Sequence, residues 1–249
     1  MGFQSAIRVA IGLLLLSNFD VPKAQAGSQN GYLGPSGVAA DQFPHPARPV
    51  APIVSDRWRA EDERERVGEA ARVIEWLGIQ RGMTVADIGA GSGYYTVRLA
   101  ARVGPQGRVL AQDIVPDYLG RLRLRLAQER LANVSVGLGE AGDPRLPRHS
   151  VDVAVLIHMY HEIEQPFALL ANLVTSLRPG ARVGILDVDD VTERHGTPRA
   201  LLACELQALG YKQVAFHWLL EQPPRSEYLA VFEPPTSPPS PDTIRPCPS

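Results

Sequence analysis

The sequence predicts an α/β fold with a doubly wound, mostly parallel central sheet that ends in a C-terminal antiparallel hairpin. Three observations predict it. Short apolar runs typical of buried strands alternate with helical segments, a glycine-rich loop follows the first run, and only residues 219–226 separate the last two runs. Strands that alternate with helices form right-handed βαβ units. A connection as short as 219–226 permits only an antiparallel hairpin.

The expected elements follow one another from residue 60 to residue 232. Apolar residues at helical spacing predict a helix over 60–77, and the first strand is expected at 84–88. The run 151–157 is continuously apolar, which is typical of a parallel strand buried on both faces. The remaining elements are helices at 94–103, 116–130, 166–177 and 198–209, and strands at 108–112, 134–138, 182–188, 211–218 and 227–232.

Residues 1–26 have the composition of a targeting segment. A weakly basic start is followed by the apolar run 9–16 and by Ala24-Gln25-Ala26, which matches the cleavage site of a signal peptide. The apolar run is too short to span a bilayer. We therefore expect a cleaved signal peptide, a periplasmic or secreted protein, and no transmembrane span after cleavage. An uncleaved N-terminus that anchors the protein in a membrane is the alternative.

The regions that flank the expected domain, residues 56–233, lack apolar periodicity. Residues 27–55 predict an extended arm, and the proline-rich residues 234–249 predict a disordered tail. The two cysteines, Cys204 and Cys247, show no metal-like spacing, and we expect two free thiols rather than a disulfide.

Charge and length exclude some classes of protein. The 249 residues include 25 Lys and Arg and 27 Asp and Glu, giving a net charge of -2. This balance argues against nonspecific binding of nucleic acid, which needs a basic face. The arginines that alternate with leucine over 121–125 fit the solvated outer face of a helix. The length suits one sizeable core, and the sequence does not indicate an oligomeric state.

The loop after the first strand carries the clearest functional signal. Residues 85–93 read Val-Ala-Asp-Ile-Gly-Ala-Gly-Ser-Gly. The three glycines let the backbone turn tightly and approach a ligand, and the amides that open the next helix favour a carboxylate. The dinucleotide fingerprint G-x-G-x-x-G fails because Tyr94 occupies its third glycine position. This argues against a nucleotide-dependent oxidoreductase.

The arrangement D-x-G-x-G-x-G, which begins at Asp87, resembles motif I of class I S-adenosylmethionine (SAM)-dependent methyltransferases. The resemblance runs from about residue 60 to residue 232. Within the family, the sequence is similar to small-molecule enzymes such as the quinone-biosynthesis C-methylases. The resemblance implies a Rossmann-like methyltransferase sheet and S-adenosyl-L-methionine as the cofactor. It also implies that Asp87 holds the methionine ammonium and that the glycines approach the methionine and ribose.

Two acidic residues at later strand ends extend the predicted cofactor site. Asp113 ends the second strand, where a carboxylate can accept hydrogen bonds from a ribose diol; capping the next helix is its alternative role. Glu140 follows the third strand and resembles the family's adenine-binding acid, which is more often Asp. The predicted cofactor-binding residues are Asp87, Gly89, Ala90, Gly91, Gly93, Asp113, Ile114, Glu140 and Ala141.

The acceptor side of the site is expected after the fourth strand, which faces the methyl group in this family. His158 or His161 could remove a proton from an acceptor, and Glu162 could orient the base; shaping the pocket rim is their alternative role. No metal is expected, because no third ligand lies at a suitable spacing. Further candidates are the set Asp187, Asp189, Asp190 and His195, and a lid that includes Arg57 and Trp58.

These observations predict a SAM-dependent methyltransferase that transfers a methyl group to a small-molecule acceptor. The alternative is an exported module that binds SAM, or its demethylated product S-adenosylhomocysteine (SAH), without turnover. Methyl transfer from a sulfonium depends mainly on positioning the two reactants. Few residues are therefore obligatory, and the sequence does not identify the acceptor.

Overall fold

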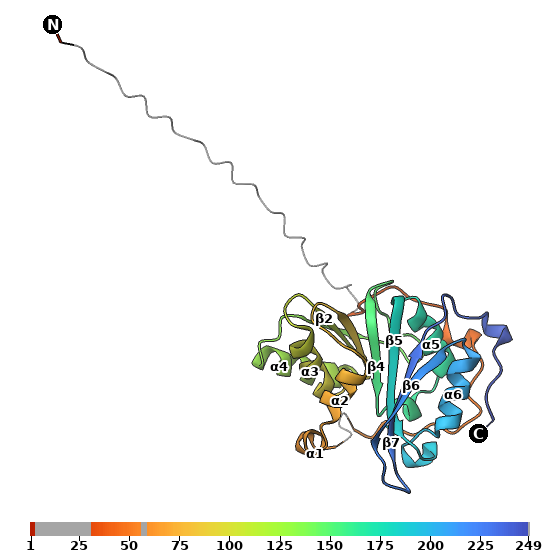
Figure 1. Ribbon diagram of the computed structural model, residues 1–249. Helices are drawn as coiled ribbons and strands as arrows, with labels where there is room; N and C mark the ends of the chain where they lie inside the picture. The colour runs from red at the N-terminus through yellow and green to blue at the C-terminus, as the bar shows by residue number, and fades with distance from the viewer. Residues whose placement is uncertain (3–30, 56–58, 249) are drawn as a thin grey trace.

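The computed structural model describes residues 1–2, 31–55 and 59–248 of the chain (Figure 1). The predicted signal peptide, apart from its first two residues, and the lid candidates Arg57 and Trp58 lie outside the described residues. Among the described residues, no helix has both the length and the apolar character that a membrane crossing requires.

The described residues form one seven-stranded sheet with the strand order β3-β2-β1-β4-β5-β7-β6 (Figure 1). Strands β1 to β5 pair in parallel, whereas β7 is antiparallel to both β5 and β6. This confirms the predicted fold, including the terminal hairpin. The strands are β1 Thr84–Ile88, β2 Arg108–Asp113, β3 Val134–Leu138, β4 Val151–Ile157, β5 Leu177–Val188, β6 Lys212–Leu220 and β7 Glu227–Glu233.

Helices cover both faces of the sheet, as the continuous apolar run of β4 predicts. Val153 and Val155 belong to the apolar cluster formed with α2 and α3, whereas Ala154 and Leu156 pack with α5 and α6. Side chains of a strand alternate between its two faces, so a strand covered on both sides has to be apolar throughout. The helices are α1 Glu61–Arg66, α2 Glu69–Trp76, α3 Tyr94–Val103, α4 Pro116–Gln128, α5 Pro166–Val174 and α6 Arg199–Ala208.

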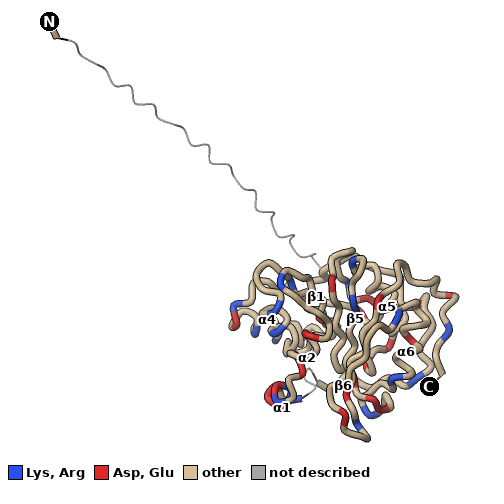
Figure 2. The backbone as a smooth tube through the Cα atoms, viewed as in Figure 1, with Lys and Arg blue, Asp and Glu red and all other residues tan. Residues whose placement is uncertain are grey.

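Most boundaries lie within a few residues of the predicted ones, and two larger differences have a structural reason. The helix expected over 60–77 is divided into α1 and α2 because Gly68 takes a left-handed conformation with φ of 64°. Strand β5 begins at Leu177 rather than at 182, since the chain continues through Gly180 with a register shift against β4. The solvated outer face predicted for α4 is confirmed, because Arg121 and Arg123 are exposed whereas Leu119, Leu122 and Leu126 are buried on the opposite side. Basic and acidic residues are interspersed along the chain (Figure 2).

The predicted N-terminal arm lies over the domain along residues 31–55. Tyr32 forms a parallel bridge with Leu138 at the end of β3. The Asn172 side chain accepts a hydrogen bond from the Val38 amide (2.8 Å) and donates one to the Val38 carbonyl (2.9 Å). Further along, the Ala51 amide donates to the carbonyl of His161 (3.0 Å). The arm thus reaches from the edge of the sheet to the segment that follows β4.

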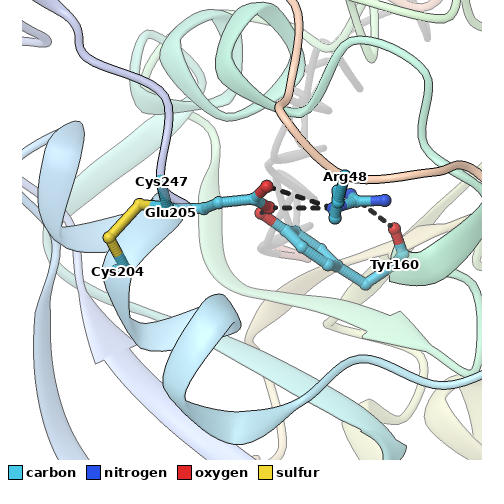
Figure 3. The surroundings of a disulfide bond; sticks show 5 residues. All are labelled: Arg48, Tyr160, Cys204, Glu205 and Cys247. Atoms are coloured by element: carbon cyan, nitrogen blue, oxygen red, sulfur yellow. Dashed lines mark hydrogen bonds and ion pairs between the residues drawn. A yellow bond between two sulfur atoms is a disulfide. The ribbon is translucent and has the colours of Figure 1, made fainter. Parts of the chain in front are cut away.

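The C-terminal segment corrects two predictions. Cys204 on α6 and Cys247 form a disulfide (Figure 3), so the expectation of two free thiols was wrong. Residues 234–248 were expected to be disordered, yet Ile244 is buried in the apolar core. Prolines exclude regular helix and sheet, but they do not prevent an extended segment from packing through one apolar side chain and one cross-link.

A buried ion pair joins the arm to α6 beside this disulfide (Figure 3). Arg48 donates from Nε to Glu205 Oε1 (3.0 Å) and from Nη2 to the Tyr160 carbonyl (3.3 Å). The Tyr160 hydroxyl donates to Glu205 Oε2 (2.8 Å). Because both charges are withdrawn from water, removing one partner would leave the other uncompensated. Arm, helix and the segment after β4 are therefore fixed to one another.

Loss of the disulfide should lower the free energy of unfolding by about 2–4 kcal/mol, because the bond closes a long loop in the unfolded chain. Urea unfolding of Cys204→Ser, Cys247→Ser and the double variant measures this. All three should lose the same amount, since each removes the same cross-link. Two thiols that react with a thiol reagent in the denatured, unreduced protein would contradict the disulfide.

Candidate functional site

A cavity of about 500 Å³ lies at the carboxyl ends of the central strands. It opens where the strand order reverses between β2-β1 and β4-β5, the position at which open α/β sheets bind ligands. Arm residues 51–55 close one side of it. The predicted site residues in its wall are Gly89, Gly91, Asp113, Ile114, Glu140, Ala141, His158 and Glu162; Asp87, Ala90, Gly93 and His161 lie behind that wall.

The glycine loop takes a conformation that other residues rarely adopt. Gly89, Gly91 and Gly93 have φ values of 70°, 52° and 85°. A Cβ on Gly93 would also lie 2.4 Å from a methyl carbon of Leu122, and a Cβ on Gly89 would lie 3.0 Å from Met159. The backbone conformation therefore favours glycine at all three positions, and a side chain at residue 89 or 93 would also force Met159 or Leu122 to move.

Asp113 holds the glycine loop against the end of β2. Its Oδ2 accepts a hydrogen bond from the Gly91 amide (2.9 Å), and its Oδ1 accepts one from the amide of Val115, the residue before α4 (2.9 Å). The carboxylate is buried and lies in the cavity wall. Each carboxylate oxygen can accept more than one hydrogen bond. Asp113 thus supports the start of α4 and can still present an acceptor to a ligand.

Asp87 lies behind the glycine loop rather than in the cavity wall. It is 3% exposed, and Thr96 Oγ1 on α3 donates to its Oδ2 (2.6 Å). Burial raises the pKa of Asp87 to about 6, and the hydrogen bond from Thr96 opposes that rise. Ionisation of Asp87 thus leaves a buried negative charge, which a nearby cation would stabilise.

Glu140 borders the cavity at the end of β3. Its Oε1 lies 3.1 Å from Nη1 of Arg145, and its loop is closed by the hydrogen bond from the Glu140 amide to the Asp143 carbonyl (2.8 Å). Arg145 also lies over the ring of Tyr32 in the arm, 3.9 Å from its centroid. The longer side chain at this position is therefore held in place by a neighbouring arginine.

A buried network centred on Glu69 was not predicted. Glu69 Oε1 accepts from Arg64 Nη2 (2.5 Å) and from the Tyr95 hydroxyl (3.2 Å), and it lies 3.5 Å from Nε2 of His158. Burial alone would raise the pKa of Glu69, but His158 and Arg64 lower it to about 2. Arg64 lies in the cavity wall, 3.8 Å from the ring centroid of Tyr94. The burial of Arg64 was not predictable from the sequence, because α1 consists of charged residues typical of a solvated helix.

His161 is held by a carboxylate on the neighbouring strand. Its Nδ1 lies 2.9 Å from Oδ1 of Asp187, the second-last residue of β5. Asp187 also accepts hydrogen bonds from Thr197 Oγ1 (2.7 Å) and from the Val188 amide (2.9 Å). Both side chains are buried. Two sequence candidates from separate motifs, His161 and Asp187, are thus brought together because β4 and β5 are adjacent.

Glu162 and His195 face the cavity in front of this pair. Glu162 Oε1 lies 4.0 Å from Nε2 of His161 and 4.0 Å from Nδ1 of His195. Burial raises the pKa of Glu162 to about 7; His161 opposes the rise, while Asp187 and Asp113 add to it. His195 has φ of 55°, a left-handed conformation that histidine tolerates better than most residues.

The other members of the acidic set bind arginines instead. Asp189 Oδ2 accepts from Arg199 Nε (2.7 Å), and Asp190 forms ion pairs with Arg194 and Arg225. These last two arginines lie in the cavity wall. Of the second candidate set, Asp187 and His195 therefore belong to the site, whereas Asp189 and Asp190 lie outside the wall.

The fold is the one found in Rossmann-like methyltransferases, and comparisons with known proteins agree. A family model described as a methyltransferase domain matches residues 85–180, which contain the glycine loop, Asp113 and Glu140. A structure of a SAM-dependent methyltransferase from Aquifex aeolicus has a TM-score of 0.62 at 23% identity, covering 68% of this chain and 92% of that one. It shows that the fold is shared.

Two curated proteins are similar to part of the chain. One is an arsenite methyltransferase from Halobacterium salinarum, 33% identical over 107 residues, which make up 43% of this chain and 27% of that protein. The other is the nocamycin O-methyltransferase of Saccharothrix syringae, 31% identical over 116 residues, or 47% and 41% of the two chains. The chain spans less than half the length of either relative.

The raised pKa of Asp87 predicts a pH-dependent effect of Asp87→Asn. The folded protein binds the Asp87 proton up to a pH of about 6, whereas an unfolded aspartate loses it near 3.9. Ionisation of Asp87 therefore lowers the stability of the folded protein as the pH rises through this window. Asparagine does not ionise and can still accept from Thr96.

The stability of Asp87→Asn relative to the natural protein should accordingly increase by about 2–3 kcal/mol between pH 4 and pH 7. Urea unfolding of both proteins across this range measures the difference, in which all other titrating groups cancel. A difference that does not change with pH would show that Asp87 titrates normally.

Proposed function

We propose that this protein is a SAM-dependent methyltransferase that acts on a small-molecule acceptor. The observation that carries the proposal is the single cavity in which the glycine loop, Asp113 and Glu140 meet the imidazole and carboxylate groups at the ends of β4 and β5. One half of the cavity suits an amino-acid-bearing nucleoside, and the other half offers groups that can bind and orient an acceptor.

The residues on the β1 to β3 side fit the parts of SAM. Asp113 would accept from the ribose hydroxyls, and Glu140 and Ala141 would border the adenine. Arg64 suits the methionine carboxylate because its guanidinium lies in the cavity wall and its Nη1 is not part of the ion pair that Nε and Nη2 form with Glu69. Asp87 is the anion nearest the predicted ammonium position, behind that loop. Bound SAM supplies an electrophilic methyl group on a positively charged sulfur.

The acceptor would lie on the β4 and β5 side. Its wall combines apolar residues of the arm with Glu162, His195 and the arginines held by Asp190. We assign contact with the acceptor to Glu162, with His161 behind it, and a positioning role to His158, whose ring lies against Glu69. A cavity of about 500 Å³ has the size of a small-molecule pocket. The near-neutral charge balance argues against nonspecific binding of nucleic acid.

Purified protein should bind SAM and SAH with micromolar dissociation constants in titration calorimetry. Asp113→Ala should weaken binding at least tenfold, because it removes the ribose acceptor and releases the Gly91 amide. Asp87→Ala should weaken it at least tenfold by removing the anion opposite the ammonium. Asp117→Ala, an exposed aspartate on α4, is the matched control and should bind normally. An absence of heat with both ligands would refute the cofactor assignment.

Turnover is tested separately by SAH release across phenols, thiols, quinols and amines. Release with one of these classes supports the enzyme. Binding of SAH without release for any class would favour the alternative, an exported module that binds the cofactor without turnover.

We also propose that the protein is exported after cleavage at Ala26. The apolar run and the Ala24-Gln25-Ala26 site support this, as does the disulfide, because disulfides persist mainly in oxidising compartments. N-terminal sequencing of protein from fractionated cells should begin at Gly27 and locate it in the periplasm or the medium. An intact N-terminus in the membrane fraction would instead support the anchored form.

A further inference from the structure

We propose that His161, Glu162 and His195 form a binding site for a divalent transition-metal ion, zinc in the first instance, on the acceptor side of the cavity. One potential ligand atom from each residue lies within 4.8 Å of the other two. Glu162 and His195 lie in the cavity wall, and His161 is directly behind them. The sequence did not predict this group, because its third member comes from the loop after β5, far along the chain.

The donor set and its spacing suit zinc. Two imidazoles and one carboxylate are ligands that catalytic zinc sites use, with a fourth position left open to water or substrate. Ligand atoms around tetrahedral zinc lie roughly 3.3 Å apart, given bonds of about 2.0–2.1 Å. The two separations of 4.0 Å from Glu162 Oε1 are slightly wider. The two histidine nitrogens lie within 4.8 Å of each other. Small rotations of the Glu162 and His195 side chains, both on the cavity wall, would bring the three ligand atoms to this spacing.

Asp187 provides the support that a metal-binding histidine requires. A histidine that binds a metal through one ring nitrogen usually donates its other N–H to a carboxylate, which fixes the ring and its tautomer. His161 Nδ1 lies 2.9 Å from Asp187, so Nε2 is the nitrogen that faces Glu162. Asp187 is itself held by Thr197 and by the Val188 amide. The ring of His161 is therefore preorganised.

The charges around the group favour a cation. Glu162 lies near two further carboxylates, Asp187 and Asp113, and among the described residues its ion-pair partners are histidines only. A second group of potential ligands in the described part of the chain, Glu69, His158 and Glu227, differs in this respect. Its carboxylates form ion pairs with Arg64 and Arg59. There the arginines already supply the positive charge that a metal would bring, whereas no arginine of residues 31–55 or 59–248 forms an ion pair with Glu162.

A role in catalysis for this ion rests on the proposed function, although the binding of the ion does not. An acceptor hydroxyl or thiol that occupied the open coordination position would have its pKa lowered by the ion and would release its proton to solvent. The resulting anion would lie on the side of the cavity assigned to the acceptor. The preferred acceptor class would then be one with an ionisable oxygen or sulfur.

The test is a calorimetric titration of the purified, metal-free protein with zinc chloride, and a titration with cobalt(II) followed by visible absorption. We expect one ion per chain and the strong visible bands of four- or five-coordinate cobalt. His195→Asn should weaken zinc binding at least tenfold, and so should Glu162→Gln. The matched control is His149→Asn: His149 is exposed, lies outside the cavity wall and has a similar left-handed φ of 47°. It should bind zinc normally.

SAH binding, measured on the same samples, separates this proposal from the proposed function. His195→Asn and Glu162→Gln should retain SAH binding, which also shows that they are folded. A natural protein that binds SAH but no stoichiometric zinc or cobalt would overturn the metal site and leave the methyltransferase assignment intact. Equal loss of zinc binding in His149→Asn and His195→Asn would overturn it as well.

Discussion

The hydrogen bond from the Gly91 amide to the Asp113 carboxylate joins the ends of two neighbouring parallel strands. The backbone hydrogen bond from the Ala90 amide to the Gln112 carbonyl (2.9 Å) also joins the glycine loop to the end of β2, but Asp113 alone binds both this loop and the amide that precedes α4. Its carboxylate thereby restricts a loop whose three left-handed glycines would otherwise have many alternative conformations. With it, the loop, the start of α4 and one wall of the cavity form a single unit. The cofactor half of the proposed site depends on this contact.

Charge is balanced in two different ways on the two sides of the cavity. Beside the glycine loop, the buried carboxylate of Glu69 is neutralised within the protein by Arg64. At the ends of β4 and β5, Glu162 and Asp187 face imidazoles, and burial keeps the pKa of Glu162 near 7. On the first side, the charges of Glu69 and Arg64 are therefore paired within the protein. The second has acidic groups that a bound cation or a polar acceptor would complete.

The fold and the grouping of the glycine loop, Asp113 and Glu140 at one cavity could be predicted because their signals are local. Strand runs, the glycine spacing and Asp113 lie within about one βαβ unit. The rest depends on residues that only the fold brings together. His195 reaches Glu162 from another loop, Asp187 reaches His161 across a strand pair, and Cys204 pairs with a cysteine 43 positions later. Arg64 was missed for a different reason, since a short charged helix gives no apolar pattern to indicate its buried face.

The hydrogen bond from the Ala51 amide to the His161 carbonyl holds the arm against the segment that follows β4. The cavity is therefore built from two parts of the chain, the domain and the arm that precedes it. The glycine loop, Asp113 and Glu140 come from strand ends of the domain, whereas residues 51–55 of the arm contribute a separate part of the cavity wall. Substitutions in that short segment can reshape the acceptor chamber without altering a strand or the glycine loop. Sequence changes in the arm of related chains would therefore alter the shape of the cavity while the glycine loop stays the same.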